Sequence, residues 1–236
     1  MAVELIQAPT AHRSASTDLQ TLKNTFEGIT HNSCPFHYNF HLHTVCSDGQ
    51  LQPEDLIQQA IRLGLRGLAI TDHHSIEGFR RASRYLTSGV GEAEAAEGLP
   101  TLWPGVEVNA GLLETEVHVL CYGFNPQAAT MQPYLQGQSV SSDHYPIQAV
   151  IQAAHGAGGV AVLAHPSRYR RSPTELIPAA AHLGIDGVET YYAYDNPTPW
   201  RPSPRQTHLV SQLAVAHQLL QTCGTDTHGL SITQRL

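Results

Sequence analysis

The short apolar runs of this chain share one feature, because most of them end in a histidine, an aspartate or a glutamate. Seven such runs read as strands, and they lie at 38–43, 67–71, 101–108, 116–124, 159–164, 185–190 and 221–225. Amphipathic segments between most of them read as helices, one of which opens with Pro53 followed by two acidic residues. Repeated strand–helix units predict a mostly parallel sheet with right-handed crossovers. Polar residues at the carboxyl ends of the strands are typical of an α/β barrel with its active site there.

The count of about seven strands favours a slightly irregular barrel over an eight-fold one. An open, doubly wound sheet is the second interpretation. Such a sheet would not naturally bring polar residues from all of its strand ends to one point, so the barrel is preferred.

The first of these runs contains a His-x-His pair, His41 and His43. Side chains at positions i and i+2 of an extended segment point to the same face, so both rings can reach one metal ion. The sequence Ser47-Asp48-Gly49 reads as a turn that could fold Asp48 back towards them. The alternative for an isolated His-x-His is a pair of exposed histidines on an edge strand.

Composition limits the classes of protein that remain. The 236 residues are 41% hydrophobic, which is enough for one sizeable core. The formal charge of -7 argues against tracking along extended nucleic acid, whose partners are usually basic. We see no run of about 18 apolar residues that would span a membrane and no secretory signal. Four widely spaced cysteines fit reduced thiols, so we expect a cytoplasmic protein.

We expect one domain after a tail. Residues 1–35 are mixed and polar, and they predict a flexible N-terminal tail with a weak helix near 17–26. Residues 36–236 form the predicted barrel. Within it, 125–144 has little periodicity and predicts a linker or a small flap.

Nine strand-end residues form the candidate metal site. They are His41, His43, Asp48, His73, Glu107, His118, His165, Asp226 and His228. Imidazole suits zinc and iron, carboxylate suits harder ions such as manganese, and a mixed set tolerates several metals. Nine groups exceed what one ion needs, because a catalytic zinc has three protein ligands and an open position. We therefore expect two or three divalent ions, with a carboxylate such as Glu107 between two of them.

These residues lie in motifs that resemble a known family. The motifs are His41-x-His43-Thr44-x-x-Ser47-Asp48-Gly49, Thr71-Asp72-His73, Gly105-Val106-Glu107, His118-Val119-Leu120, Ala164-His165-Pro166 and Gly224-Thr225-Asp226-x-His228-Gly229. In this order, over about residues 38–230, they resemble the successive motifs of the PHP (polymerase and histidinol phosphatase) family. The resemblance implies a distorted (β/α)7 TIM-like barrel, a trinuclear centre of Mn, Fe or Zn, and hydrolysis of phosphate esters.

The resemblance also implies how the ligands are divided. The first ion would have His41, His43, Glu107 and Asp226, the second Glu107, His118 and His165, and the third Asp48, His73 and His228. Asp48 would then serve a different ion from the histidine pair that precedes it.

The stretch 164–169 looks most similar to stand-alone nucleotide and RNA-end phosphoesterases. We therefore expect a phosphomonoester substrate, such as a nucleotide or an RNA or DNA end, cleaved by attack of a metal-activated hydroxide on phosphorus. Two features depart from those relatives. Only 46 residues separate His118 from His165, which leaves no room for their sizeable helical insertion. His74 stands where many relatives have Asp or Asn.

Several further residues are assigned to catalysis or substrate binding. A planar guanidinium can bind two phosphate oxygens, and Arg168 is the first choice for that role, with Arg170 or Arg171 behind it. Asp72 and Glu107 complete the predicted catalytic set, and Asp72 would orient a ligand imidazole or cap a helix.

Other positions stay open at this stage. Tyr169 and His74 are predicted to face the substrate. Glu189 also ends a strand, and the pattern leaves open whether it reaches the site. The loop residues Tyr191, Tyr192, Tyr194 and Trp200 could stack a base or pack the loop onto the barrel, and packing is favoured.

Other functions compete with the phosphoesterase. A histidinol-phosphatase-like enzyme for a small molecule lies in the same class. An amidohydrolase-type metallohydrolase also begins with His-x-His, but it usually needs a strand-end lysine, and no lysine follows Lys23. A non-catalytic metal-bearing domain is the third alternative. The oligomeric state is left open by the sequence.

Overall fold

Seven strands form the centre of the computed structural model, which describes residues 18–88 and 98–236. They are β1 (Tyr38–Asn39), β2 (Gly67–Ile70), β3 (Thr101–Leu112), β4 (Thr115–Tyr122), β5 (Val160–Leu163), β6 (Gly187–Tyr191) and β7 (Leu220–Cys223). They pair in chain order, in parallel except where β4 runs antiparallel to both β3 and β5. Residues after β7 pair with those after β1, since Asp226 N donates to His41 O at 2.9 Å. The predicted α/β barrel of seven strands is confirmed, nearly closed on itself.

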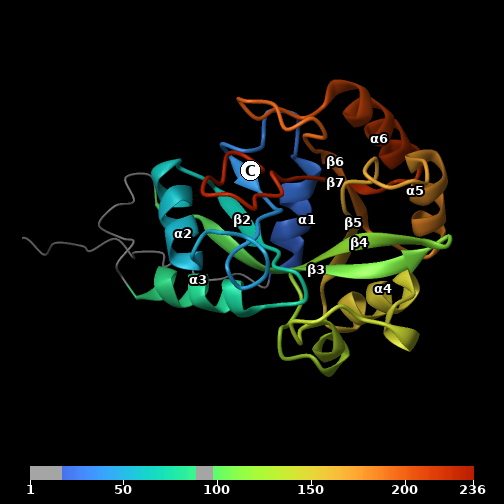
Figure 1. Cartoon of the computed structure of the whole chain (residues 1–236), viewed down its shortest axis with the longest axis horizontal. Coiled ribbons are helices and arrows are strands. Elements are labelled where there is room, and N and C mark those ends of the chain that lie inside the picture. Colours follow the sequence, from blue (N-terminus) through green and yellow to red (C-terminus); the bar gives the residue numbers. More distant parts are fainter. Residues whose placement is uncertain (1–17, 89–97) are drawn as a thin grey trace, which may run out of the picture.

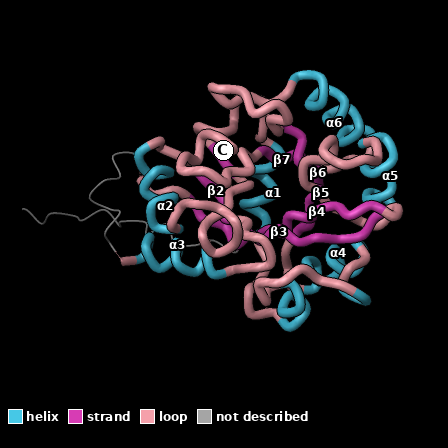
Figure 2. Tube along the Cα trace, viewed as in Figure 1, coloured by secondary structure: helices cyan, strands magenta, loops and turns pink. Residues whose placement is uncertain are grey.

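Six α-helices cover these strands (Figures 1 and 2). They are α1 (Leu19–Glu27), α2 (Pro53–Arg62), α3 (Glu77–Thr87), α4 (Ile147–Gly156), α5 (Pro173–His182) and α6 (Pro204–Ala216). Local sequence explains where several begin. Pro53 and Pro173 occupy first-turn positions, where a missing N–H costs nothing. Ser172 and Glu175 form a reciprocal capping box at the start of α5.

A hairpin replaces one helix of the expected alternation. Strands β3 and β4 are joined directly by Leu113 and Glu114, which have positive φ angles of 49° and 57° as a tight two-residue hairpin turn requires. Asn109 lies opposite His118 in this register. Because side chains alternate along a strand, Glu107 and His118 point to the same face of the hairpin.

The N-terminal helix corrects one prediction. Leu22 and Phe26 of α1 are buried in the cluster that fills the barrel, and the Phe26 ring lies 4.8 Å from Phe40 and 5.5 Å from Tyr122. The chain is therefore packed from α1 onwards, and the prediction of a flexible tail up to residue 35 is wrong for 18–35. Two buried apolar side chains one helical turn apart were enough to dock a short helix. The remainder of the predicted tail, residues 1–17, lies outside the described residues.

The segment 125–144 is a small packed flap. It contains the 3₁₀ helices η1 (Ala129–Tyr134) and η2 (Ser142–His144). Met131 and Tyr134 are buried in the main core. Gly137 N donates to His74 O at 2.8 Å, so the flap reaches the strand ends.

No helix in residues 18–88 and 98–236 combines the length and the apolar character needed to cross a membrane.

Candidate active site

All nine residues predicted as ligands gather at one end of the barrel. They come from the ends of β1, β2, β5 and β7, from the β3–β4 hairpin and from the loop after β1. Glycine permits one of these approaches, because a Cβ at Gly224 would lie only 2.1 Å from the Cβ of His41. The barrel topology therefore does what the sequence pattern predicts, since it collects groups that are up to 187 positions apart, as His41 and His228 are.

Glu107 occupies the middle of this cluster and is 1% exposed. Its Oε2 lies 3.0 Å from His41 Nε2 and 3.0 Å from His43 Nε2. Its Oε1 lies 2.8 Å from His118 Nδ1 and 3.1 Å from His165 Nε2. Each oxygen of one carboxylate thus faces a different pair of imidazoles. This is the geometry expected of a group that bridges two cations.

The buried group of His41, His43, Glu107 and Asp226 can hold a divalent cation. Asp226 Oδ1 lies 3.4 Å from His41 Nε2 and 3.3 Å from His43 Nε2. A cation about 2.1 Å from each ligand atom would set neighbouring ligand atoms about 3.0 Å apart at right angles and about 3.4 Å apart in a tetrahedron. The observed separations of 3.0 to 3.4 Å therefore fit a cation at their centre.

Two further groups surround this one. In one, Asp48 Oδ2 lies 3.2 Å from His228 Nε2 and 3.8 Å from His73 Nε2, and His43 borders the same group. The other contains His73, Glu107 and His118. Asp48 thus lies with His73 and His228, as the family resemblance implies. His73 differs from that scheme, because its ring also lies 3.6 Å from Glu107 Oε2.

The carboxylates and imidazoles of this centre shift one another's pKa values. Burial alone would raise the pKa of the Glu107 carboxyl, but the His41 and His118 imidazoles hold that pKa well below its usual range. Burial would lower the pKa of His43, but hydrogen bonds to Asp226 and Glu107 raise it to about 9. Burial lowers the pKa of His73 to about 4, so it is on rings such as His43 that protons persist to alkaline pH in the metal-free chain. Divalent cations can replace them, since metal ligation requires deprotonated imidazole nitrogens.

Glu189 lies behind the cluster and is bonded to two of its histidines, His41 and His165. Its Oε1 lies 2.9 Å from His41 Nδ1, and its Oε2 accepts from His165 N at 2.8 Å. A carboxylate at Nδ1 fixes the tautomer of a ligating histidine and leaves the Nε2 lone pair for the metal. The sequence left the role of Glu189 open, and its position at a strand end was the only available signal.

Asp72 is bonded to the loop that follows β1. Its carboxylate accepts from Thr44 N at 2.6 Å, from Thr44 Oγ1 at 2.7 Å and from Ser47 Oγ at 2.8 Å. Among the described residues no histidine ring is hydrogen-bonded to it, and it caps no helix. Ser47 Oγ, which donates to Asp72, also lies 3.5 Å from His43 Nδ1, so any orientation of a ligand imidazole by Asp72 would act through Ser47 and stays a prediction. Asp72 fixes the loop that carries Asp48.

Two arginines and a tyrosine share the outer oxygen of Asp226. Arg168 Nη1 and Arg235 Nε each lie 2.9 Å from Oδ2, and Tyr192 donates to the same oxygen at 2.7 Å. Arg168 thus reaches the centre as predicted. Sequence reasoning missed Arg235, because it lies beyond the last recognisable motif and no local pattern distinguishes it.

The residues predicted to bind substrate beside Arg168 are largely engaged within the protein. Tyr169 accepts from His118 N at 2.7 Å and donates to Ala164 O at 3.2 Å, so its hydroxyl links β4 to β5. His74 is 3% exposed, and its Nε2 accepts from Asn109 N at 3.2 Å. The Tyr169 hydroxyl is thus bonded within the protein, although Tyr169 also lines a cleft beside Arg168, and His74 borders the mouth of the site, so their contact with substrate stays a prediction.

The aromatic loop after β6 packs onto the barrel. Tyr192 is 2% exposed and Trp200 is 6% exposed. The favoured interpretation of packing is confirmed for these two side chains, and neither presents a free face to a base.

Backbone strain marks the same strand ends. His74, His165 and Asp226 have positive φ angles of 51°, 26° and 54°. Such conformations cost roughly 1–3 kcal/mol each and persist where surrounding structure enforces them. Two of the three, His165 and Asp226, are candidate ligands, so the strained backbone positions side chains of the site.

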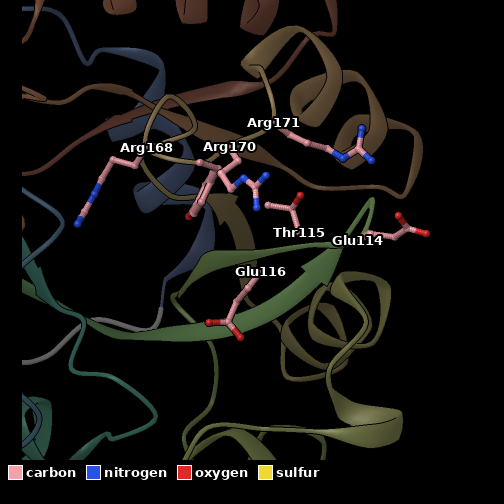
Figure 3. A pocket seen from close by; sticks show the side chains of 7 residues that line it. Glu114, Thr115, Glu116, Arg168, Arg170 and Arg171 are labelled. Atoms are coloured by element: carbon pink, nitrogen blue, oxygen red, sulfur yellow. The ribbon is translucent and has the colours of Figure 1, made fainter.

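One cleft opens onto the cluster, and a second lies beside Arg168. One, of about 490 Å³, contains Asp48, His73 and His118 among its lining residues. The other, of about 630 Å³, lies between the hairpin turn and the loop after β5 and is lined by Glu114, Thr115, Glu116, Arg168, Tyr169, Arg170 and Arg171 (Figure 3). Glu116 borders both clefts. In Figure 3 the Arg168 side chain points away from Arg170 and Arg171, so these three arginines do not form a single cluster.

Comparison with known proteins agrees with this picture. The PHP domain model matches residues 39–164. The 5′-3′ exoribonuclease Rnm of Salmonella typhimurium is 24% identical over 263 aligned positions, which cover 81% of this chain and 85% of that protein. An error-prone DNA polymerase of Cutibacterium acnes is 28% identical over 80% of this chain, which spans only 18% of the polymerase.

Solved structures show the same fold. A predicted metal-dependent phosphoesterase from Bifidobacterium adolescentis superposes with a TM-score of 0.64 at 24% identity, over 83% of this chain and 88% of that one. An amidohydrolase from Chromobacterium violaceum superposes with a TM-score of 0.67 at 19% identity, over 85% and 90%. With the family model covering more than half of its length, the chain belongs to the PHP domain family and is a hydrolase of phosphoester bonds.

Proposed function

We propose that this chain hydrolyses a phosphomonoester at a nucleotide or at an RNA or DNA end, using two or three divalent cations of Mn, Fe or Zn. The nine strand-end residues would hold these ions. The observation that carries the proposal is the placement of Glu107, whose two oxygens face separate imidazole pairs at 2.8 to 3.1 Å. Paired cations suit phosphoryl transfer, because they stabilise both the attacking and the leaving oxygen.

The ion positions follow from the three groups. His41, His43, Glu107 and Asp226 would hold one ion, Glu107, His118 and His165 a second, and Asp48, His73 and His228 a third. His73 Nε2 also lies 3.6 Å from Glu107 Oε2, so His73 could be a ligand of either of two ions. When bound, such cations lower the pKa of water towards neutrality and polarise the phosphoryl group.

Protein groups would do the remaining work. Arg168 lies at the edge of the centre, with a side chain that is 40% exposed, so it can bind phosphoryl oxygens without leaving Asp226. Glu189 would keep His41 in the tautomer that presents Nε2. Asp72 would hold Asp48 at the correct distance through Thr44 and Ser47.

Two observations favour a nucleotide or nucleic-acid end over an extended strand. The Rnm relatives, which are 24% identical to this chain, are 5′-3′ exoribonucleases. Their alignment spans 263 positions but includes only 81% of this 236-residue chain, so those proteins contain segments that this chain lacks. The net charge of -7 offers little attraction to a long phosphate backbone.

A substrate panel tests the proposal. The Mn-loaded chain would be assayed for phosphate release from 5′- and 3′-phosphorylated oligoribonucleotides and oligodeoxyribonucleotides, mononucleotides, histidinol phosphate and p-nitrophenyl phosphate. We expect release from the nucleotide substrates, loss of activity on chelation and recovery with Mn. Preference for histidinol phosphate would favour the small-molecule alternative. No release from any ester by the metal-loaded chain would refute the proposed activity.

A further inference from the structure

The C-terminal segment 229–235 folds back onto the strand ends, and Figure 1 shows the C-terminus lying over the strands. Several hydrogen bonds hold this segment there. Asn39 Nδ2 donates to Ile232 O at 2.9 Å, Thr227 Oγ1 donates to Gln234 O at 2.6 Å, and His228 N donates to Arg235 O at 2.7 Å. The backbone of Arg235 is therefore bonded directly to a residue of the proposed metal centre.

The Arg235 side chain extends to the same centre. Its Nε lies 2.9 Å from Asp226 Oδ2, and the side chain is 18% exposed. Arg168 Nη1 lies 2.9 Å from that same oxygen. The other oxygen of Asp226, Oδ1, lies 3.3 Å from His43 Nε2. Two guanidinium groups thus stand beside the proposed cation positions, joined through one carboxylate.

This arrangement leaves both charge and hydrogen-bonding capacity unused. The one negative charge of Asp226 can neutralise only one of the two guanidinium charges that contact it. A guanidinium has five N–H donors in a planar fork. Arg168 commits Nη1 and Arg235 commits Nε to Asp226, and donors remain on both groups.

We propose that Arg235 is a substrate-binding residue that forms, with Arg168, a two-arginine clamp on the non-bridging oxygens of the phosphoryl group. A dianionic phosphoryl group would relieve the repulsion between the two guanidinium groups and accept their remaining donors. The C-terminal segment 229–235 then belongs to the active site. This inference rests on the proposed function, because it assigns the phosphoryl-binding groups of that same site.

Arg171 is less suited to this role than Arg235. Arg171 donates to Leu113 O at 2.5 Å and pairs with Glu175 at 2.9 Å, so its guanidinium is engaged on the outer side of the hairpin. In Figure 3 Arg171 points away from Arg168.

Binding of inorganic phosphate to the Mn-loaded full chain tests the clamp directly by titration calorimetry. The variants are Arg235→Gln and Arg235→Lys, with Arg205→Gln as the matched control, because Arg205 is exposed in the first turn of α6. We expect Arg235→Gln to weaken phosphate binding by about 10- to 100-fold, as loss of a charge-assisted hydrogen bond predicts. Arg235→Lys should recover part of the affinity, because it keeps the charge without the fork. The control should bind as the wild type does.

Manganese content, measured on the same samples, separates substrate binding from a purely structural role. The clamp predicts unchanged manganese content in Arg235→Gln and Arg235→Lys. Unchanged phosphate affinity in both variants would overturn it, and so would loss of manganese with normal phosphate affinity in the reloaded protein. If the wild type hydrolyses no ester yet shows Arg235-dependent phosphate binding, the proposed function fails and the clamp stands. If it hydrolyses esters with no contribution from Arg235, only the clamp fails.

Discussion

Replacing Glu107 with glutamine tests the centre of the site most directly. Glutamine has nearly the same shape, but it removes the negative charge and turns one oxygen into an NH2 donor. In the wild type, Oε1 and Oε2 face four imidazole nitrogens at 2.8 to 3.1 Å. An amide can accept at one of these positions only, so the variant cannot bridge two cations as a carboxylate does.

The expected loss is large. Removing one preorganised charge-stabilising group from an active site typically costs a factor of 10²–10³ in rate, or about 3–4 kcal/mol. Glu107 would in addition hold two ions, so we expect kcat/KM of Glu107→Gln to fall by about 10³-fold or more, together with the manganese content.

The measurement combines phosphate release by the Mn-loaded protein with metal analysis and circular dichroism. Glu27→Gln is the matched control, since it makes the same chemical change at an exposed residue at the end of α1. The control should retain activity to within about twofold and its full manganese content. Near-normal turnover of Glu107→Gln with a native spectrum and full metal content would refute the bridging role.

Three other predictions follow from the structure. The pKa of His43 is raised to about 9 in the metal-free chain, so manganese must displace a proton from His43 below that pH. The apparent manganese affinity should therefore fall about tenfold per pH unit below pH 9, which calorimetry can measure. A manganese affinity that does not change between pH 6.5 and 9 would contradict this prediction. Tyr169→Phe removes a hydroxyl bonded to two backbone groups, so the free energy of unfolding measured with urea should fall by about 1–3 kcal/mol, while KM stays within about twofold. A raised KM at unchanged stability would instead show that the hydroxyl binds substrate. Phe26→Ala should destabilise the chain by about 3–5 kcal/mol, and a loss under about 1 kcal/mol would show that α1 is not part of the folded core.

The sequence could single out the nine candidate ligands because most of them lie in or directly after a strand, and the barrel topology brings these positions to one end. His-x-His after β1 and the carboxylate in β3 are local patterns, and their convergence follows once the strands are parallel neighbours. Asp48 was harder, since it lies on a loop. Its placement with His73 and His228 depends on Asp72, which fixes that loop through Thr44 and Ser47.

Residues outside the motifs could not be assigned in this way. Arg235 reaches Asp226 only because hydrogen bonds from distant elements fold the C-terminal segment back. The sequence also could not show that the Tyr169 hydroxyl bonds to the backbone of His118 and Ala164, which lie on neighbouring strands.

By itself the sequence determined the order of strands and helices and the barrel class, and it singled out the candidate metal-binding groups, because periodicity and strand-end chemistry are local properties. The tertiary structure alone decided which oxygen of Glu107 faces which histidines, that Glu189 supports His41, and that Arg168 and Arg235 share Asp226. It also decided that α1 belongs to the core. These features depend on contacts between residues far apart in the chain, and such contacts form only when the barrel folds.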